Sequence, residues 1–117
     1  MMQSIEVVRR RYTKLAKVLL RDHSVIQLTR KKGFGSSGLY TRDKLFAFLS
    51  HRNRLVLKLP RERVNELIAG HEVTRWDPRG KGRALKEWAV LRPSSKIKWL
   101  SLAREAMEFV TSQNQEH

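Results

Sequence analysis

The spacing of apolar residues along the chain predicts three helices. The first covers about residues 4–21, the second covers residues 61–70, and the third begins at Ser94 or Ser95 as its N-cap. In each segment apolar side chains recur at steps of three and four residues, which places them on one face of a helix. In the last helix two adjoining apolar stripes cover about half of the circumference. Core packing and a dimer contact therefore both remain open for that helix.

Strands are predicted where apolar residues alternate with polar ones or cluster in short β-rich runs. Residues 25–31 form one strand, and residues 45–50 and 55–59 form a hairpin because only a short polar link separates them. A further strand is expected at residues 84–91, after an irregular stretch at residues 71–83. The order helix, three strands, helix, one or two strands, helix predicts a two-layer α+β domain. Its antiparallel sheet should carry the helices mainly on one face.

Length and composition limit the classes of protein that this chain can represent. With 117 residues it has the size of one domain, expected at residues 1–112, with a disordered tail at residues 113–117. It contains no cysteine, which excludes disulfides, thiolate zinc sites and cysteine nucleophiles. No apolar run approaches the roughly 18 residues of a membrane helix, and the N-terminus has no secretory pattern. We therefore expect no membrane partner and a cytoplasmic location.

Charge is the strongest compositional feature of the chain. Twenty-five lysines and arginines against eleven acidic residues give a formal net charge of +14, which attracts polyanions to the surface whatever their sequence. The excess is concentrated in residues 1–32, which hold nine basic residues and two acidic ones. Three groups of cations are candidate phosphate contacts: Arg10, Lys14, Lys17 and Arg21 on the first helix, Arg30, Lys31 and Lys32 before a glycine-rich stretch, and Arg79, Lys81 and Arg83 in a later loop.

The glycine-rich stretch contains a G-x-G-x-x-G string at Gly33, Gly35 and Gly38. A dinucleotide-binding loop with this string must lead from a strand into a helix, so that the phosphates meet the helix N-terminus. Here the string is followed by an aromatic-rich block with strand character. The pattern therefore favours a structural glycine turn between two strands, and the sequence indicates no cofactor.

Candidate catalytic groups are sparse. Glu62 and Glu66 lie four residues apart on one helical face, but neighbouring arginines favour a solvent-exposed charged surface over general acid-base catalysis, which needs a desolvated cleft. The four histidines lack the spacing of metal ligands, and no nucleophile elbow surrounds the serines. We therefore expect no catalytic residues, no metal site and no enzymatic activity.

A family resemblance is carried by residues 31–40, 45–48, 54–59, 77–78, 82–90 and 102–106. These stretches resemble the N-terminal domain of the TfoX/Sxy family, whose members carry a Phe-Gly-x-x-Gly-Leu-Tyr block, a Lys-Leu-Phe-Ala strand and a strand that ends in lysine. The strand around Trp88 is also similar to the related YjbR-like group. Gly33 and the basic run at residues 79–83 depart from the family pattern. The resemblance implies a two-layer α+β fold, often dimeric, with no established catalytic residues.

Two functions from different classes remain open at this point. The first is a non-enzymatic, nucleic-acid-associated domain, such as a transcription- or competence-type accessory protein, that makes weak and non-specific phosphate contacts. The second is a homodimeric, chaperone-like interaction module whose basic surface binds an acidic protein partner. The net charge favours the first. Convergence of the three basic groups on one face would support it further.

Overall fold

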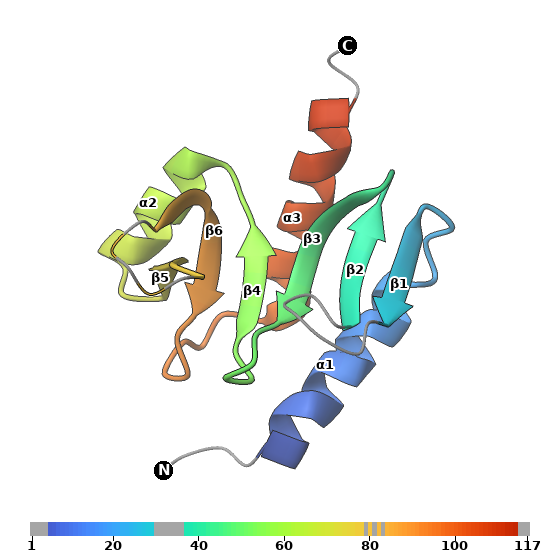
Figure 1. Ribbon diagram of the computed structural model, residues 1–117, viewed down its shortest axis with the longest axis horizontal. Helices are drawn as coiled ribbons and strands as arrows, with labels where there is room; N and C mark the ends of the chain where they lie inside the picture. The colour runs from blue at the N-terminus through green and yellow to red at the C-terminus, as the bar shows by residue number, and fades with distance from the viewer. Residues whose placement is uncertain (1–4, 30–36, 79, 81, 83, 115–117) are drawn as a thin grey trace.

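The computed structural model describes residues 5–29, 37–78, 80, 82 and 84–114, and within them it shows a six-stranded sheet and three helices (Figure 1). In chain order the elements are α1 (Ile5–Leu19), β1 (Val25–Thr29), β2 (Ser37–Thr41), β3 (Lys44–Leu49), β4 (Leu55–Lys58), α2 (Arg61–Ala69), β5 (Val73–Trp76), β6 (Leu85–Leu91) and α3 (Trp99–Asn114).

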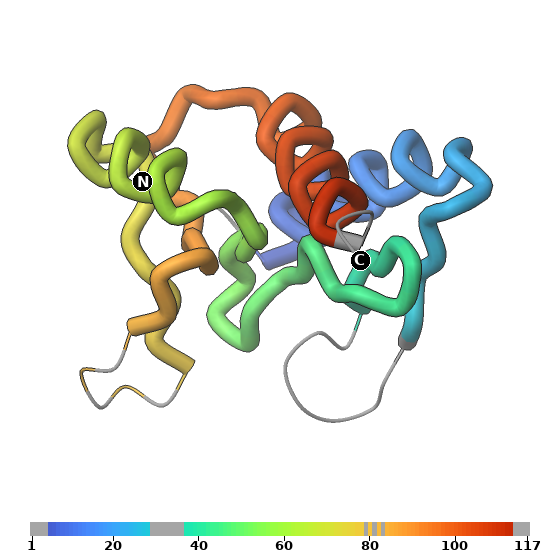
Figure 2. Tube along the Cα trace, turned by 90° about the horizontal axis from the view of Figure 1, so that it is seen from above, coloured from blue at the N-terminus to red at the C-terminus, as the bar shows by residue number. Residues whose placement is uncertain are grey.

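The sheet is antiparallel throughout, with the strand order β1-β2-β3-β4-β6-β5. Figure 2 shows all three helices on one side of the strands, so the described residues form two layers and leave one face of the sheet without a described helix. The predicted α+β class is confirmed. We call the helix-free side the open face of the sheet.

Helix α1 buries the stripe that its sequence predicts, apart from its first residue. Val8, Tyr12, Leu15 and Leu19 are buried, whereas Ile5 is 53% exposed because the first turn extends beyond the ends of the strands (Figure 1). After the helix, the Asp22 carboxylate accepts hydrogen bonds from the Ser24 N–H at 2.9 Å and from its hydroxyl at 2.7 Å. These hydrogen bonds lower the pKa of Asp22 and fix the turn into β1.

Tyr12 connects α1 to the sheet through a buried hydrogen bond. Its side chain is 3% exposed, and its hydroxyl donates to the Ser37 carbonyl oxygen of β2 at 2.6 Å. Burial, and secondarily the charge of Tyr40, raises the pKa of Tyr12 well above its ordinary range. The folded protein therefore holds this phenol in its neutral, donating form.

The substitution Tyr12→Phe is expected to lower the free energy of unfolding by about 1 kcal/mol at neutral pH, because the short hydrogen bond to the Ser37 carbonyl oxygen is lost while the Gln27 amide at 3.2 Å still donates to that oxygen. Because the pKa of Tyr12 is higher in the folded protein than in the unfolded chain, its neutral phenol contributes fully to stability at pH values below the unfolded pKa of about 10. This contribution is lost as the pH rises above about 10 and through the folded pKa. Urea denaturation at several pH values between neutral and alkaline would measure both effects. If the unsubstituted protein and Tyr12→Phe lost the same unfolding free energy between neutral and alkaline pH, this role of Tyr12 would be contradicted.

The region around β2 departs from the sequence prediction. We expected one strand at residues 45–50 after a glycine turn, but the structure has two strands, and Gly38 lies inside β2 opposite Leu28. Arg42 and Asp43, both with positive φ, form the two-residue turn between β2 and β3. The assignment of Gly38 to a turn is therefore corrected. Gly33 and Gly35 lie outside the described residues.

A β-bulge in β3 brings two consecutive residues into the core. Leu39 pairs with Ala47 and Tyr40 pairs with Leu45, which leaves Phe46 as the extra residue of β3. Phe46 and Ala47 are both fully buried in the cluster between the sheet and the helices. Simple alternation along the strand would have placed one of them on the open face.

The predicted hairpin is confirmed by the pairing of β3 with β4. Helix α2 occupies its predicted position, with Gly70 at its C-cap, where the Gly70 N–H donates to the Glu66 carbonyl oxygen. Strand β5, however, lies inside the stretch that we expected to be irregular, and it forms an edge of the sheet beside β6. It has only four residues, of which Val73 alone is buried, so its alternation is too short to recognise.

Helix α3 packs against the middle strands with most of its wide apolar surface. Leu102, Ala103, Ala106 and Val110 are buried, and the remaining apolar residues pack around them: Ile97, Trp99, Leu100, Met107 and Phe109. Core packing therefore accounts for both predicted stripes. The predicted N-cap is wrong, because the helix begins at Trp99 and the Ser95 hydroxyl instead donates to the Glu72 carboxylate. The helix also includes Gln113 and Asn114, which we had assigned to the tail.

Candidate functional site

The basic ridge, defined here as Arg10, Lys14, Lys17 and Arg21, lies on the outer side of α1 and in the turn that follows it. All four residues are exposed, and the buried residues of α1 occupy the opposite side of the helix at 100° per residue. The ridge therefore points away from the core. The predicted placement of Arg10, Lys14 and Lys17 on one exposed helical face is confirmed. Helix α1 ends at Leu19, however, so Arg21 is an exposed residue of the following turn and not of the helix.

No acidic residue of the described chain neutralises this ridge by an ion pair. The ion pairs among residues 5–29, 37–78 and 84–114 lie on α2 or between α2 and α3. They join Arg61 to Glu62, and Arg63 to Glu66 and Glu105. The positive charge of the ridge thus remains available to an external anion.

The other predicted phosphate contacts cannot be placed beside the ridge. Arg30, Lys31, Lys32, Arg79, Lys81 and Arg83 lie outside the described residues. The convergence of the three basic groups thus stays a prediction, and α1 is the group whose geometry is known.

On the open face, an aromatic cluster covers the centre of the sheet where no described helix does. The Phe48 ring lies 5.0 Å from the Trp76 ring and 5.8 Å from the Trp88 ring, and the two indoles are 5.7 Å apart. Within this cluster Phe48 is 0% exposed, as is Val56 of β4, and the Lys58 ammonium lies 5.6 Å from the Trp88 ring. Val56, which is buried outside the main core cluster, therefore belongs with Phe48 to a second, smaller apolar cluster.

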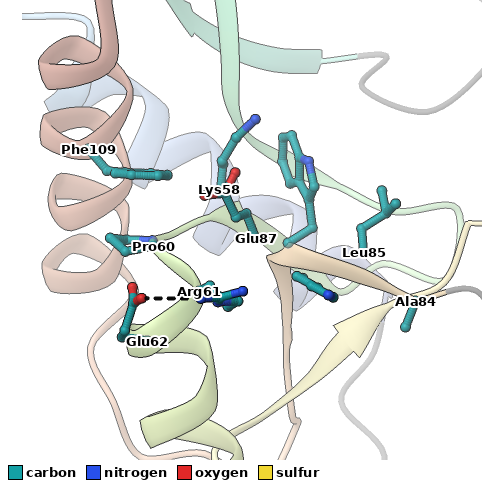
Figure 3. A pocket seen from close by; sticks show the side chains of 10 residues that line it. Lys58, Pro60, Arg61, Glu62, Ala84, Leu85, Glu87 and Phe109 are labelled. Carbon is teal, nitrogen blue, oxygen red and sulfur yellow. Dashed lines mark ion pairs between the residues drawn. The ribbon is translucent and has the colours of Figure 1, made fainter. Parts of the chain in front are cut away.

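A cavity of about 660 Å³ lies between the end of β4, the start of α2 and strand β6 (Figure 3). Its wall includes Phe109 of α3 and the pair formed by Arg61 and Glu62, whose charged atoms are 3.9 Å apart. The side chain of Glu62 is 76% exposed and that of Glu66 is 66% exposed. The expectation that these two carboxylates lie on a solvent-exposed surface is confirmed, and the cavity does not desolvate them.

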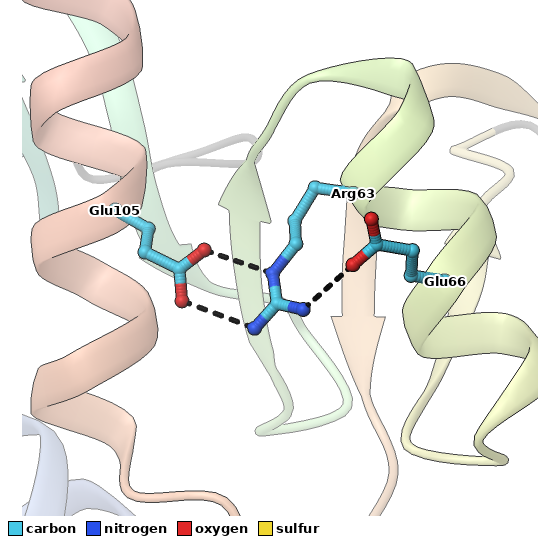
Figure 4. Close-up of polar contacts among 3 residues, drawn as sticks. All are labelled: Arg63, Glu66 and Glu105. Atoms are coloured by element: carbon cyan, nitrogen blue, oxygen red, sulfur yellow. Dashed lines mark hydrogen bonds and ion pairs between the residues drawn. The ribbon is translucent and has the colours of Figure 1, made fainter.

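Glu66 belongs instead to a structural contact between α2 and α3 (Figure 4). The Arg63 guanidinium donates to the Glu66 carboxylate at 3.0 Å and to both oxygens of Glu105 on α3 at 2.9 and 3.3 Å. The hydrogen bond to Glu105, followed by the contacts with Glu66, raises the pKa of Arg63. This bidentate geometry orients the two helices and leaves Glu66 committed to an ion pair.

A concentration of arginines surrounds the turn between β3 and β4, which separates two cavities of about 700 and 520 Å³. Arg52 and Arg54 of the turn line both cavities. Arg75 lines the larger cavity, whereas Arg11 and Arg92 line the smaller one. Sequence reasoning missed this grouping because the arginines come from separate segments, and no local motif connects them.

Metal-ligand clusters and membrane-spanning helices were both sought in the described part of the chain. Among those residues, no group of three or more histidines and acidic residues could hold a metal ion. Likewise, none of the described helices is long and apolar enough to cross a membrane.

Comparison of the chain with protein-family models, with curated proteins and with solved structures finds no match. Its function is therefore inferred from its own residues and their arrangement.

Proposed function

We propose that this chain is a non-enzymatic, nucleic-acid-associated domain and that the basic ridge of α1 contacts phosphates. The observation that carries this proposal is the placement of Arg10, Lys14 and Lys17 opposite the buried stripe of α1, followed by the exposed Arg21, on a chain of net charge +14. Contacts of this kind position a protein on a polyanion but read no base sequence. Binding is thus weak, salt-sensitive and largely independent of sequence.

The geometry of α1 suits this role. Residues 10–17 extend over about 10 Å of helix at 1.5 Å per residue, and a duplex carries roughly six phosphate charges over that length. The helix is held against the sheet by its buried stripe and by the Tyr12 hydrogen bond, so the ridge sits on a rigid support. A pre-positioned row of cations loses less conformational freedom on binding than a flexible basic tail.

The resemblance to the TfoX/Sxy N-terminal domain agrees with this proposal, and we include membership of that group in it. The antiparallel sheet with helices on one face matches the fold that the resemblance implies. A transcription- or competence-type accessory role would give such non-specific contacts a biological setting. The proposal itself depends on the charge and geometry of α1.

Fluorescence anisotropy with labelled duplex DNA tests the function directly. We expect binding at low salt, with the logarithm of the affinity falling linearly against the logarithm of salt concentration at a slope of about −3.6 for four phosphate contacts. Two duplexes of unrelated sequence should bind within a few-fold of each other. An absence of binding at low salt, or a strong preference for one duplex, would contradict the proposal.

A second candidate function is the homodimeric interaction module, and the open face favours it. Ile26 and Leu28 are exposed on the edge strand β1, which β2 separates from the aromatic cluster, and Leu85 is exposed on β6. Exposed apolar patches of this kind often mark contacts between proteins. Sedimentation velocity would show a dimer that Ile26→Lys with Leu28→Lys disrupts. A protein that stays monomeric at high concentration would exclude this alternative.

A further inference from the structure

A narrow cleft on the helix side of the molecule combines an apolar floor with arginines. It has a volume of about 520 Å³ and lies where the start of α1, the turn between β3 and β4, and the segment from β6 to α3 meet. We call it the arginine cleft. Its lining residues are Ile5, Val8, Arg11, Arg52, Asn53, Arg54, Leu91, Arg92, Pro93, Ser95 and Trp99.

The floor of the arginine cleft is apolar and partly open to solvent. Val8 and Leu91 are nearly buried, Trp99 is half-buried, and Ile5 remains 53% exposed beside them. A ligand that covered this floor would remove apolar surface from water, at roughly 25 cal/mol per Å². The cleft therefore favours an apolar group in its occupant.

The rim of the cleft is strongly positive. Its described lining carries Arg11, Arg52, Arg54 and Arg92 and no acidic residue, although the Glu72 carboxylate accepts a hydrogen bond from Ser95 of this lining. None of the four arginines forms an ion pair with a described residue. The Arg11 guanidinium is stacked 4.2 Å from the centre of the Trp99 ring, which orients it beside the floor. Guanidinium groups in this setting can pair bidentately with carboxylates.

The backbone that presents these arginines is fixed by hydrogen bonds. The Ser50 hydroxyl oxygen accepts from the N–H groups of Arg52 and Arg54, both at 3.3 Å. On the opposite rim, the Arg92 N–H donates to the Glu72 carbonyl oxygen at 2.9 Å. The cations are therefore carried on ordered turns and need little reorganisation to meet a ligand.

We propose that the arginine cleft binds a short acidic-hydrophobic segment of a partner protein, with one large apolar side chain on the floor and flanking carboxylates on the arginines. The charge of the rim and the apolar floor together specify this chemistry. A cavity of about 520 Å³ accommodates a few side chains. It is too small for a standard protein interface, so recognition depends on a short motif.

The cleft is less suited to a nucleotide. The polar side chains that line it, besides the arginines, are Asn53 and Ser95. The Asn53 side chain accepts a hydrogen bond from Arg9, and the Ser95 hydroxyl donates to Glu72 and accepts from the Ile97 N–H. One face of Trp99 is covered by Arg11. A base would thus find few side-chain partners for its edge and a stacking surface that is partly occupied.

Fluorescence anisotropy with a labelled synthetic peptide, in which Glu alternates with Phe and Leu, tests this inference. We expect saturable binding that weakens at least about tenfold when Gln replaces every Glu, and likewise when Ala replaces every Phe and Leu. Equal binding of the Gln peptide, or of the Ala peptide, would overturn the proposal, because one half of the recognition would then be absent.

Variants of the chain locate the peptide site. The double substitution Arg54→Glu with Arg92→Glu is expected to weaken peptide binding by at least about tenfold. Lys44→Glu with Arg104→Glu changes the net charge equally at exposed positions outside the cleft lining, and should leave the affinity within about twofold. Circular dichroism confirms that both proteins are folded. Equal losses in the two variants would show that net charge alone attracts the peptide, and would overturn the assignment.

The same variants separate this inference from the proposed function. The cleft variant should keep the DNA affinity of its charge-matched control, because the basic ridge is intact in both. A cleft variant that loses DNA binding selectively while peptide binding is unchanged would show that the cleft holds nucleic acid, and would overturn the peptide assignment. If the chain binds no DNA at all, the proposed function fails, and the peptide experiments with their controls still decide the inference about the cleft.

Discussion

Replacement of Phe48 by alanine is expected to lower the free energy of unfolding by about 3–5 kcal/mol, the usual cost of truncating a buried phenylalanine. Phe48 is 0% exposed although it lies on the open face, and its ring contacts those of Trp76 and Trp88. Without the Phe48 ring, Trp76 and Trp88 each lose an aromatic contact, and a cavity forms next to Val56. Urea denaturation followed by tryptophan fluorescence measures the loss.

Ile26→Ala is the matched control for this prediction. Ile26 is also an apolar residue of the open face but is 46% exposed, so its truncation should cost less than about 1 kcal/mol. A loss below about 1 kcal/mol for Phe48→Ala would contradict the view that the aromatic cluster stabilises the open face. It would indicate instead that the helix side of the sheet supplies nearly all of the apolar stabilisation.

The elements predicted correctly from the sequence are those with long, regular patterns. Helix α1 has enough periodic residues to define both its type and its buried face, and strand β6 has enough to define its type. The failures have local causes. The turn at Arg42 and Asp43 adopts positive φ without the Asn-Gly or Asp-Gly pair that usually marks it, so β2 was not recognised as a strand separate from the glycine-rich stretch before β3. The bulge at Phe46 then displaced the expected alternation.

The two candidate sites also differ in how far the sequence predicts them. The placement of Arg10, Lys14 and Lys17 follows from helical periodicity alone, because all three belong to α1, whereas Arg21 lies in the turn after it. The arginine cleft depends on tertiary structure, since Arg11, Arg54 and Arg92 come from three segments that only the sheet order brings together. Its rim also depends on Ser95, whose hydrogen bond to Glu72 replaces the N-cap that the sequence suggested.

The basic ridge and the arginine cleft suit two different classes of anionic partner that a chain of this charge attracts. The basic ridge presents its cations on a convex helix with no apolar floor, which suits a phosphate backbone. The arginine cleft places its cations around apolar side chains, which suits carboxylates next to hydrophobic anchors. Net charge alone predicts neither preference, and the arrangement of apolar residues between the cations distinguishes them.

Neutralising the whole ridge with Arg10→Gln, Lys14→Gln, Lys17→Gln and Arg21→Gln is expected to lower the affinity for duplex DNA by on the order of a thousandfold at low salt. Each cation that contacts a phosphate releases a condensed counterion, so the loss of four contacts should also reduce the salt slope by about 3.6. Glutamine keeps helix propensity, and these exposed side chains make no described core contact, so the fold should be retained. Anisotropy titrations across a range of salt concentrations measure both quantities.

The decisive comparison is with an equally charged protein that keeps the ridge. Four exposed cations elsewhere, Lys44, Lys86, Lys96 and Arg104, can be changed to glutamine without touching α1. This control loses the same net charge, so it shares any weakening of the long-range attraction, but it should keep most of the salt slope because its phosphate contacts are intact. If both proteins lost affinity and slope equally, the ridge would have no special part in binding. A selective loss in the ridge variant, by contrast, would locate the phosphate contacts on α1.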